Sequence, residues 1–174
     1  MPVLTAPATA TAPALRLRPW SAADAAALAE VCPYEDLSTG PHDAAALPAW
    51  LRTQEEGWER EDRFGFAILE RDGAGERLVG HVLLKDLAPP QAEVGYWTTR
   101  AARGRAVAPR AVEAVTGWAF ATRGLTRLHL LHQEDNTASC RVAEKSGYAF
   151  SRVLPAFPPA FPRDGHLHVR HLTA

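Results

Sequence analysis

A short basic loop near the middle of the chain has the residue types of an anion-binding site. Arg103, Gly104 and Arg105 follow the stretch 93–98 and precede a periodically apolar stretch that begins at Val107. This order predicts a strand, a glycine-containing loop and the first turn of a helix. The first backbone N–H groups of a helix have no partner within it, so with the two arginines they favour a phosphate or pyrophosphate. An ordinary strand-to-helix turn with solvated arginines is the alternative interpretation.

A second segment, from Asn136 to Tyr148, combines a helix start, a hydroxyl group and a helix stop. Asn136 suits the N-cap of a helix, and Gly147 suits the position that follows a helix end. Ser139 falls in the first turn of this predicted helix. Its hydroxyl is either available to a ligand or bonded to a backbone carbonyl of its own helix.

Together the two segments resemble the GNAT superfamily of acyl-CoA-dependent N-acetyltransferases. The similarity is greatest to the branch that acetylates the N-termini of ribosomal proteins and a range of small amines. The pyrophosphate loop of that family reads Gln or Arg, two residues, Gly, one residue, then Gly or Ala. Arg103, Ala106 and Ala108 fill these three places, and Ala106 departs from the usual glycine.

The resemblance extends from about Leu15 to the end of the chain. It is strong over 93–113 and 136–150 and weak over 32–62. It implies acetyl-CoA as co-substrate and no metal. It also implies that the sheet splays between its fourth and fifth expected strands, where the cofactor would enter.

The resemblance further implies which residues act on the cofactor. Many family members have a tyrosine seven residues after Asn136, but this chain has Ala143 there and Ser139 one turn earlier. In the N-terminal and small-amine branch such a serine lies near the sulfur. The expected cofactor-binding residues are Trp97, Thr98, Arg103, Gly104, Arg105, Ala106, Val107, Ala108, Asn136 and Ser139.

An amine that attacks a thioester must be neutral, and the reaction needs donors for the oxyanion and a proton or hydrogen bond for the leaving thiolate. We expect the backbone N–H groups of 96–98 to serve the oxyanion and Ser139 to serve the thiolate. Glu93, on the face of Gly95 and Trp97, could relay the amine proton through water, or be a partly exposed structural glutamate. An α-amine, with a pKa of about 7.7–8.0, is substantially neutral near pH 7 even without a dedicated base.

The acceptor site is expected between residues 32–62 and the closing strands. Acidic residues crowd that region, and an acidic wall suits a cationic amine. Tyr34, Glu35 and Asp36 are the expected substrate-binding residues. The glutamates at 55, 56 and 59 are better explained as a solvated helix face.

Three histidines near the end of the chain raise the question of a metal site. On a strand, His166 and His168 share a face and His171 takes the other. No cysteine or carboxylate cluster completes a ligand set at the usual spacing, so the sequence predicts no metal. Cys140 is expected to be a small buried hydrophobe.

Length and composition limit the class of protein. The chain has 174 residues, 47% hydrophobic and 22% charged, which is typical of one globular domain. Its net charge of -1 argues against a nucleic-acid binder. Two cysteines, at 32 and 140, without a C-x-x-C pattern suit a reducing cytoplasm, and no apolar run approaches the ~20 residues of a membrane span. Residues 1–13 are expected to be a disordered tail and 14–174 the acetyltransferase domain.

The elements that must position these residues follow from hydrophobic periodicity. Strands are expected over 15–18, 64–69, 78–84, 92–98, 125–132, 148–154 and 165–171. Helices are expected over 22–31, 45–60, 107–122 and 136–145, the first with a capping box of Ser21 and Asp24. The order predicts an α+β fold with a single mixed, mostly antiparallel sheet of about seven strands and helices on both faces.

The function that follows is transfer of an acetyl group from acetyl-CoA to a primary amine, either a peptide N-terminus or a small-molecule amine, by direct transfer. The alternative is a non-catalytic acyl-CoA-binding module. Ala106 and Ala143 favour the module, whereas Gly104, Asn136 and Ser139 favour the enzyme. The sequence leaves open the acceptor and whether the protein is a monomer or a homodimer.

Overall fold

The computed structural model describes residues 1–174 except 32–39, 42, 73–74, 160 and 174. The strands are β1 (Leu4–Ala6), β2 (Leu15–Pro19), β3 (Phe64–Asp72), β4 (Gly75–Ala88), β5 (Gln91–Thr98), β6 (Arg127–Gln133), β7 (Ala149–Leu154) and β8 (Gly165–His171). The helices are η1 (Ala22–Asp24), α1 (Ala25–Val31), α2 (Leu47–Arg60), η3 (Arg100–Ala102), α3 (Val107–Thr122) and α4 (Thr137–Lys145).

All eight strands form one sheet in the order β1-β2-β3-β4-β5-β6-β8-β7. Among the described strand pairs, only β5–β6 is parallel, because η3 and α3 form the crossover between these two strands. The α+β class and the mixed, mostly antiparallel sheet are therefore confirmed, with eight strands where about seven were expected.

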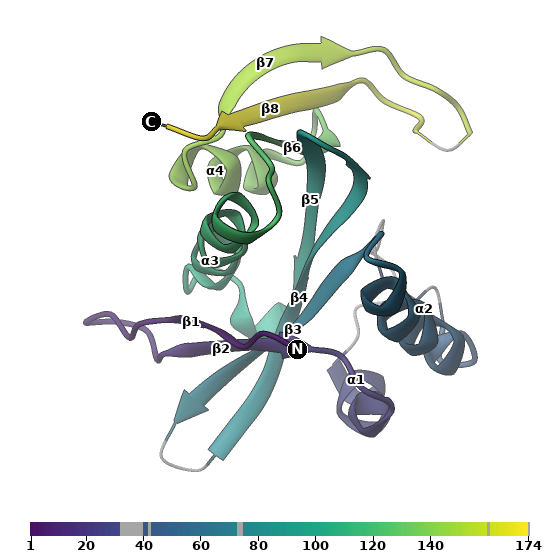
Figure 1. Ribbon diagram of the computed structural model, residues 1–174, viewed down its shortest axis with the longest axis vertical. Coiled ribbons are helices and arrows are strands. Elements are labelled where there is room, and N and C mark those ends of the chain that lie inside the picture. Colours follow the sequence, from purple (N-terminus) through teal and green to yellow (C-terminus); the bar gives the residue numbers. More distant parts are fainter. Residues whose placement is uncertain (32–39, 42, 73–74, 160, 174) are drawn as a thin grey trace.

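Helices cover both faces of the sheet (Figure 1): α3 and α4 lie on one side, and α1 and α2 on the other. On the first side, Val107, Val112 and Val115 of α3 are buried in the larger apolar cluster. On the other side, Leu28 of α1 and Leu51 of α2 pack in a second cluster. The sheet is thus buried on both faces, as the order of elements predicts.

The first strand corrects the expectation of a disordered tail over 1–13. Leu4–Ala6 pair antiparallel with β2, and Thr9 and Ala12 close a further bridge. The Arg110 side chain of α3 donates to the carbonyls of Pro7 and Pro13, at 2.6 and 2.8 Å. The segment has little apolar bulk, so its order comes from backbone pairing and from one arginine, which hydrophobic patterning does not reveal.

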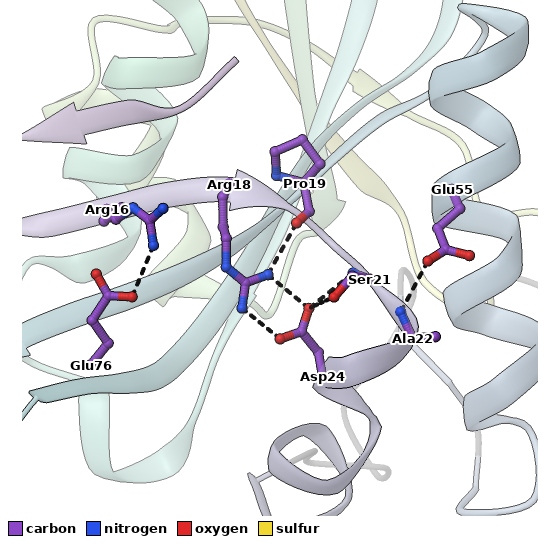
Figure 2. A network of polar contacts seen from close by, with 8 residues as sticks. All are labelled: Arg16, Arg18, Pro19, Ser21, Ala22, Asp24, Glu55 and Glu76. Carbon is purple, nitrogen blue, oxygen red and sulfur yellow. Dashed lines mark hydrogen bonds and ion pairs between the residues drawn. The ribbon is translucent and has the colours of Figure 1, made fainter. Parts of the chain in front are cut away.

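A polar network holds η1 and α1 against the sheet (Figure 2). Arg18 of β2 makes two hydrogen bonds to the Asp24 carboxylate, at 2.8 and 2.6 Å. Asp24 also accepts from the Ser21 backbone N–H, and these two residues form the predicted capping box. Burial alone would raise the pKa of Asp24, but Arg18 and Ser21 hold it below its usual value. The Glu55 carboxylate of α2 accepts from the Ala22 N–H, so α2 also holds η1, which leads directly into α1.

The imidazole ring of His81 lies among the tryptophan side chains of the second apolar cluster. His81 of β4 accepts a hydrogen bond from Trp20 Nε1 over 2.9 Å, and the rings of Trp50 and Trp97 lie beside it. His81 is completely buried. Burial lowers its pKa to about 3, so the ring is neutral in the folded protein at all ordinary pH values.

The sheet splays where the resemblance implied. β5 and β6 pair only from Gln91 with Arg127 to Val94 with Leu130. The second half of β5 remains paired with β4, and the second half of β6 remains paired with β8. The two strands therefore diverge after Val94, and a gap opens between them.

Candidate active site

A cavity of about 600 Å³ lies beside the gap, between β5 and the N-terminal ends of α3 and α4. Its volume is within the usual range for small-molecule and cofactor sites. It is lined by Tyr96, Trp97, Thr98, Ala102, Arg103, Gly104, Ala106, Val107, Ala108, Pro109, Asn136, Ala138, Ser139, Arg141, Val142 and Lys145. Every expected cofactor-binding residue except Arg105 belongs to this lining.

The basic loop leads into the N-terminus of α3, and both line the cavity. α3 begins at Val107, so the backbone N–H groups of Val107 and Ala108 have no acceptor within the helix, and Pro109 has no N–H. Gly104 and Ala106 both have positive φ, 76° and 56°. Ala106 therefore adopts a left-handed conformation that costs a residue with a Cβ about 1–2 kcal/mol, which explains why glycine is usual there in the family.

At the opposite wall, Ser139 lies in a chain of hydrogen bonds. The Asn136 side chain accepts from the Ser139 N–H over 3.1 Å, so Asn136 is an N-cap, as expected. The Ser139 hydroxyl oxygen accepts from Tyr96 Oη over 2.9 Å. Burial raises the pKa of Tyr96 to about 12, so this phenol stays protonated near neutral pH and remains a donor.

Cationic side chains from two elements line the cavity. Arg103 comes from the loop, and Arg141 and Lys145 come from α4. Sequence reasoning missed Arg141 and Lys145. Lys145 lies three residues after Val142, which lies three residues after Ser139, so consecutive members of this series are neighbours on the helix, and this signal could have found Lys145.

Arg105 differs from its expected role. Its guanidinium donates to the buried Glu70 carboxylate over 2.9 Å, and Arg77 donates to the same oxygen. Arg105 lines a second, smaller cavity of about 250 Å³ instead of the larger one. Its side chain thus binds Glu70 of β3.

Backbone donors of β5 face the gap. The Thr99 N–H donates to the Val79 carbonyl on β4 over 2.9 Å. Successive residues of a strand direct their backbone groups to alternate sides, so Trp97 shares the side of Thr99. The N–H groups of Tyr96 and Thr98 therefore point to the opposite side, from which β6 has diverged.

Of the remaining expected site residues, the structure describes only Glu93. Glu93 forms an ion pair with Lys85 over 2.8 Å and is outside the cavity lining. It lies on the sheet face of Trp97, opposite to the face of Tyr96. Tyr34, Glu35 and Asp36 lie outside the described residues.

The structure corrects the description of Cys140 as a small buried hydrophobe. Cys140 is partly exposed, and its Sγ lies 3.5 Å from His166 Nδ1 and 3.7 Å from His168 Nε2. His166 and His168 share one face of β8, as expected. His132 of β6 joins them, so a cysteine does complete a set of histidines, contrary to the expectation from spacing.

The open sheet with two diverging strands, the N-terminus of α3 and the cation-lined cavity define the class: an α+β protein whose cavity suits an extended anionic co-substrate. Residues 14–149 match the family model described as the acetyltransferase (GNAT) domain. Because this match covers most of the sequence, the chain belongs to the GNAT acetyltransferase family. The family uses acetyl-CoA and requires no metal.

Several solved structures are similar to the chain. RimJ of Mycobacterium smegmatis, in complex with CoA-disulfide, has a TM-score of 0.80 and 20% identity, covering 92% of this chain and 83% of that one. A Salmonella typhimurium acetyltransferase that modifies the N-terminal serine of a 50S ribosomal subunit protein has a TM-score of 0.80 and 15% identity, covering 97% and 99%. MccE, a microcin self-immunity acetyltransferase in complex with acetyl-CoA and AMP, has a TM-score of 0.79 and 14% identity, covering 91% and 92%. At these identities the likeness shows a shared fold.

No curated protein matches the chain by sequence. Among the described residues, no helix is both long enough and apolar enough to cross a membrane.

Proposed function

We propose that the protein is an acetyl-CoA-dependent N-acetyltransferase that transfers the acetyl group directly to a primary amine. The observation that carries this proposal is the hydrogen bond from Tyr96 to Ser139 at the wall of the cavity. It places an oriented hydroxyl beside the gap, opposite the phosphate-binding features of the loop. A module that only binds acyl-CoA needs the loop but does not need a hydrogen-bond donor for a departing thiolate.

The loop and α4 hold the phosphates of the co-substrate. The free N–H groups of Val107 and Ala108 supply fixed donors, and the helix dipole favours negative charge there. Arg103, Arg141 and Lys145 line the same cavity and supply positive charge. The co-substrate contributes a reactive thioester, which the phosphate contacts position at the gap.

Two groups of the chain act on the charges that develop as the amine attacks. The N–H groups of Tyr96 and Thr98 face the gap and stabilise the oxyanion. Ser139 is the proposed catalytic residue for the thiolate. Because Tyr96 donates to its oxygen, the Ser139 O–H bond is directed elsewhere and can donate to the departing sulfur.

Glu93 is proposed as a relay for the amine proton through water. It lies on the sheet face covered by α1 and α2, and Lys85 holds its carboxylate in place. A base matters most while the amine is protonated, so Glu93→Gln should lower the rate at pH 6.5 more than at pH 9. A deficit that is constant over this range would instead assign Glu93 a structural or binding role.

The acceptor is proposed to be a peptide N-terminus or a small-molecule amine, contacted by Tyr34, Glu35 and Asp36. One similar solved structure is of a protein that modifies the N-terminal serine of a ribosomal protein, which supports the peptide class. The acidic residues of 32–62 favour a cationic acceptor of either kind.

A thiol-release assay with acetyl-CoA tests the proposal, using peptides of varied first residue and a panel of small amines. We expect thiol release with at least one acceptor, and loss of about ten-fold or more in turnover in Ser139→Ala, with acetyl-CoA affinity within about two-fold. A protein that binds acetyl-CoA but releases no thiol with any acceptor would be the binding module instead.

A further inference from the structure

Four side chains that can bind a metal converge at the edge of the cavity wall. His132 lies near the end of β6, Cys140 lies in α4, and His166 and His168 lie on one face of β8. One ligand atom from each of these residues lies within 4.8 Å of the other three. The acetyl-transfer reaction described above uses none of them.

Three separations among these atoms are close to those of a tetrahedral zinc site, and all the atoms lie within 4.8 Å of one another. Bond lengths of about 2.3 Å to sulfur and about 2.0–2.1 Å to nitrogen place S and N about 3.5 Å apart, and two N about 3.4 Å apart, around a tetrahedron. The observed Sγ–N distances are 3.5 Å to His166 Nδ1 and 3.7 Å to His168 Nε2. The Nε2 atoms of His132 and His168 are 3.2 Å apart.

We propose that His132, Cys140, His166 and His168 bind a zinc ion. Three imidazoles and one thiolate are borderline to soft ligands, which suits zinc rather than magnesium or calcium. The four side chains fill a tetrahedral coordination shell and leave no open position. The ion therefore has a structural role and takes no part in the acetyl transfer.

The surroundings of the cluster direct its donor atoms inward. His132 Nδ1 donates to the Gln133 carbonyl over 2.7 Å, which leaves its Nε2 lone pair for the ion. Metal-bound imidazoles usually have such an outer hydrogen bond. The Phe150 ring packs edge-on against His166 and His168, at centroid distances of 5.2 and 5.7 Å.

β6 and β8 already pair along their length, and the site would join α4 to this pair of strands. Cys140 adjoins Ser139, so an ion bound here fixes the first turn of α4 relative to β6 and β8. Zinc would thus hold the Ser139 wall of the cavity in place without touching the co-substrate. Zinc binding can be measured without any turnover, so its failure and failure of the proposed acetyltransferase activity are separate results.

Metal titration of the full-length, chelator-stripped protein tests the site. We expect one zinc ion per chain, in competition with a chromophoric chelator, and a rise of several degrees in melting temperature. Cobalt, as a spectroscopic substitute, should give the intense visible bands of a tetrahedral site and a thiolate-to-metal charge-transfer band.

Variants separate coordination from general effects on the fold. Cys140→Ser should abolish the charge-transfer band. Cys140→Ser and His166→Gln should each weaken zinc binding by more than about 10–100-fold, which is the usual loss when a residue that only hydrogen-bonds a metal ligand is replaced. The control is His171→Gln, an exposed histidine next along the same strand, which should bind zinc like the parent. Circular dichroism verifies that each variant is folded. Absence of stoichiometric zinc, or equal affinity in Cys140→Ser and His171→Gln, would overturn the proposal and leave a cluster held by hydrogen bonds alone.

Discussion

Tyr96 Oη lies 2.9 Å from Ser139 Oγ, and this hydrogen bond joins β5 to the first turn of α4 over a separation of 43 residues. Tyr96 lies on β5 beyond Val94, the last residue of this strand that pairs with β6. Tyr96 is therefore a positioning residue: it determines which way the Ser139 hydroxyl can donate.

Removal of the Tyr96 hydroxyl should reduce turnover through Ser139. In Tyr96→Phe the serine is free to rotate, so we expect turnover to fall by about ten-fold, while acetyl-CoA affinity stays within about two-fold. Steady-state kinetics give the turnover, and calorimetry gives the affinity.

A double-mutant cycle tests whether the two hydroxyls act as a unit. In the Ser139→Ala background, Tyr96→Phe should have almost no further effect on turnover, because the group that it positions is gone. If the double variant instead lost turnover by the product of the two single losses, Tyr96 would act independently of Ser139.

A negative charge in the loop should weaken co-substrate binding. Ala106→Glu keeps a Cβ at this left-handed position, so its backbone cost is unchanged, but it adds an anion beside the free N–H groups of Val107 and Ala108. Two charges about 5 Å apart repel by about 1 kcal/mol or more, so acetyl-CoA affinity should fall at least about five-fold in calorimetry.

Ala121→Glu is the matched control, because Ala121 is exposed at the other end of α3. Its acetyl-CoA affinity should stay within about two-fold of the parent. Arg123 would be a poor control, since it pairs with Glu61 and covers the Phe64 ring. Equal losses in the two glutamate variants would disprove the loop assignment.

The N-terminal segment should contribute to stability. Deletion of residues 1–13 removes β1 and the carbonyls that Arg110 binds, so we expect the melting temperature to fall by several degrees. Deletion of residues 1–3 alone, which precede β1, should have a much smaller effect in the same thermal scan. Similar melting temperatures for both deletions and the parent would show that β1 adds nothing to stability in solution.

His81 should make the protein less stable in acid. Its pKa is about 3 in the folded state, against an ordinary value of 6.5, so the unfolded chain takes up a proton that the folded protein does not. The stability is complete above about pH 6.5, and each unit of pH below that removes up to about 1.4 kcal/mol until the pH approaches 3.

The measurement is urea unfolding from about pH 7 to pH 4.5. His81→Asn keeps an acceptor for Trp20 and cannot titrate, so its free energy of unfolding should fall less steeply with decreasing pH than that of the parent. Carboxylates and the other histidines titrate alike in both proteins and cancel in the difference. Parallel curves would mean that His81 is not the group responsible.

Local patterns predicted most of the fold. The apolar spacing and the basic loop predicted α3 over 107–122, and alternation predicted β8 over 165–171, both as observed. The strand β1 escaped prediction because Leu4–Ala6 offer no periodic apolar pattern, and their pairing depends on β2 and on Arg110.

The lining of the candidate cavity was predicted where its signal is local in sequence. The loop from Arg103 to Ala108 and the cap at Asn136 can be recognised from adjacent residues. The Tyr96–Ser139 bond and the histidine cluster cannot, because their members come from separate elements that meet only after the sheet forms. The side chain of Arg105 illustrates the same limit: a buried glutamate 35 residues earlier in the chain determines where it points.

The divergence of β5 and β6 also affects how the protein is stabilised. Only four residue pairs join these strands, so beyond Val94 and Leu130 the two parts of the sheet are connected by side chains and not by backbone bonds. A molecule that fills the gap contacts both parts of the sheet and links them reversibly. Its binding adds RT ln(1 + [L]/Kd) to the free energy of unfolding, where [L] is its free concentration and Kd its dissociation constant. Resistance to heat and to proteases should therefore rise and fall with the supply of that molecule.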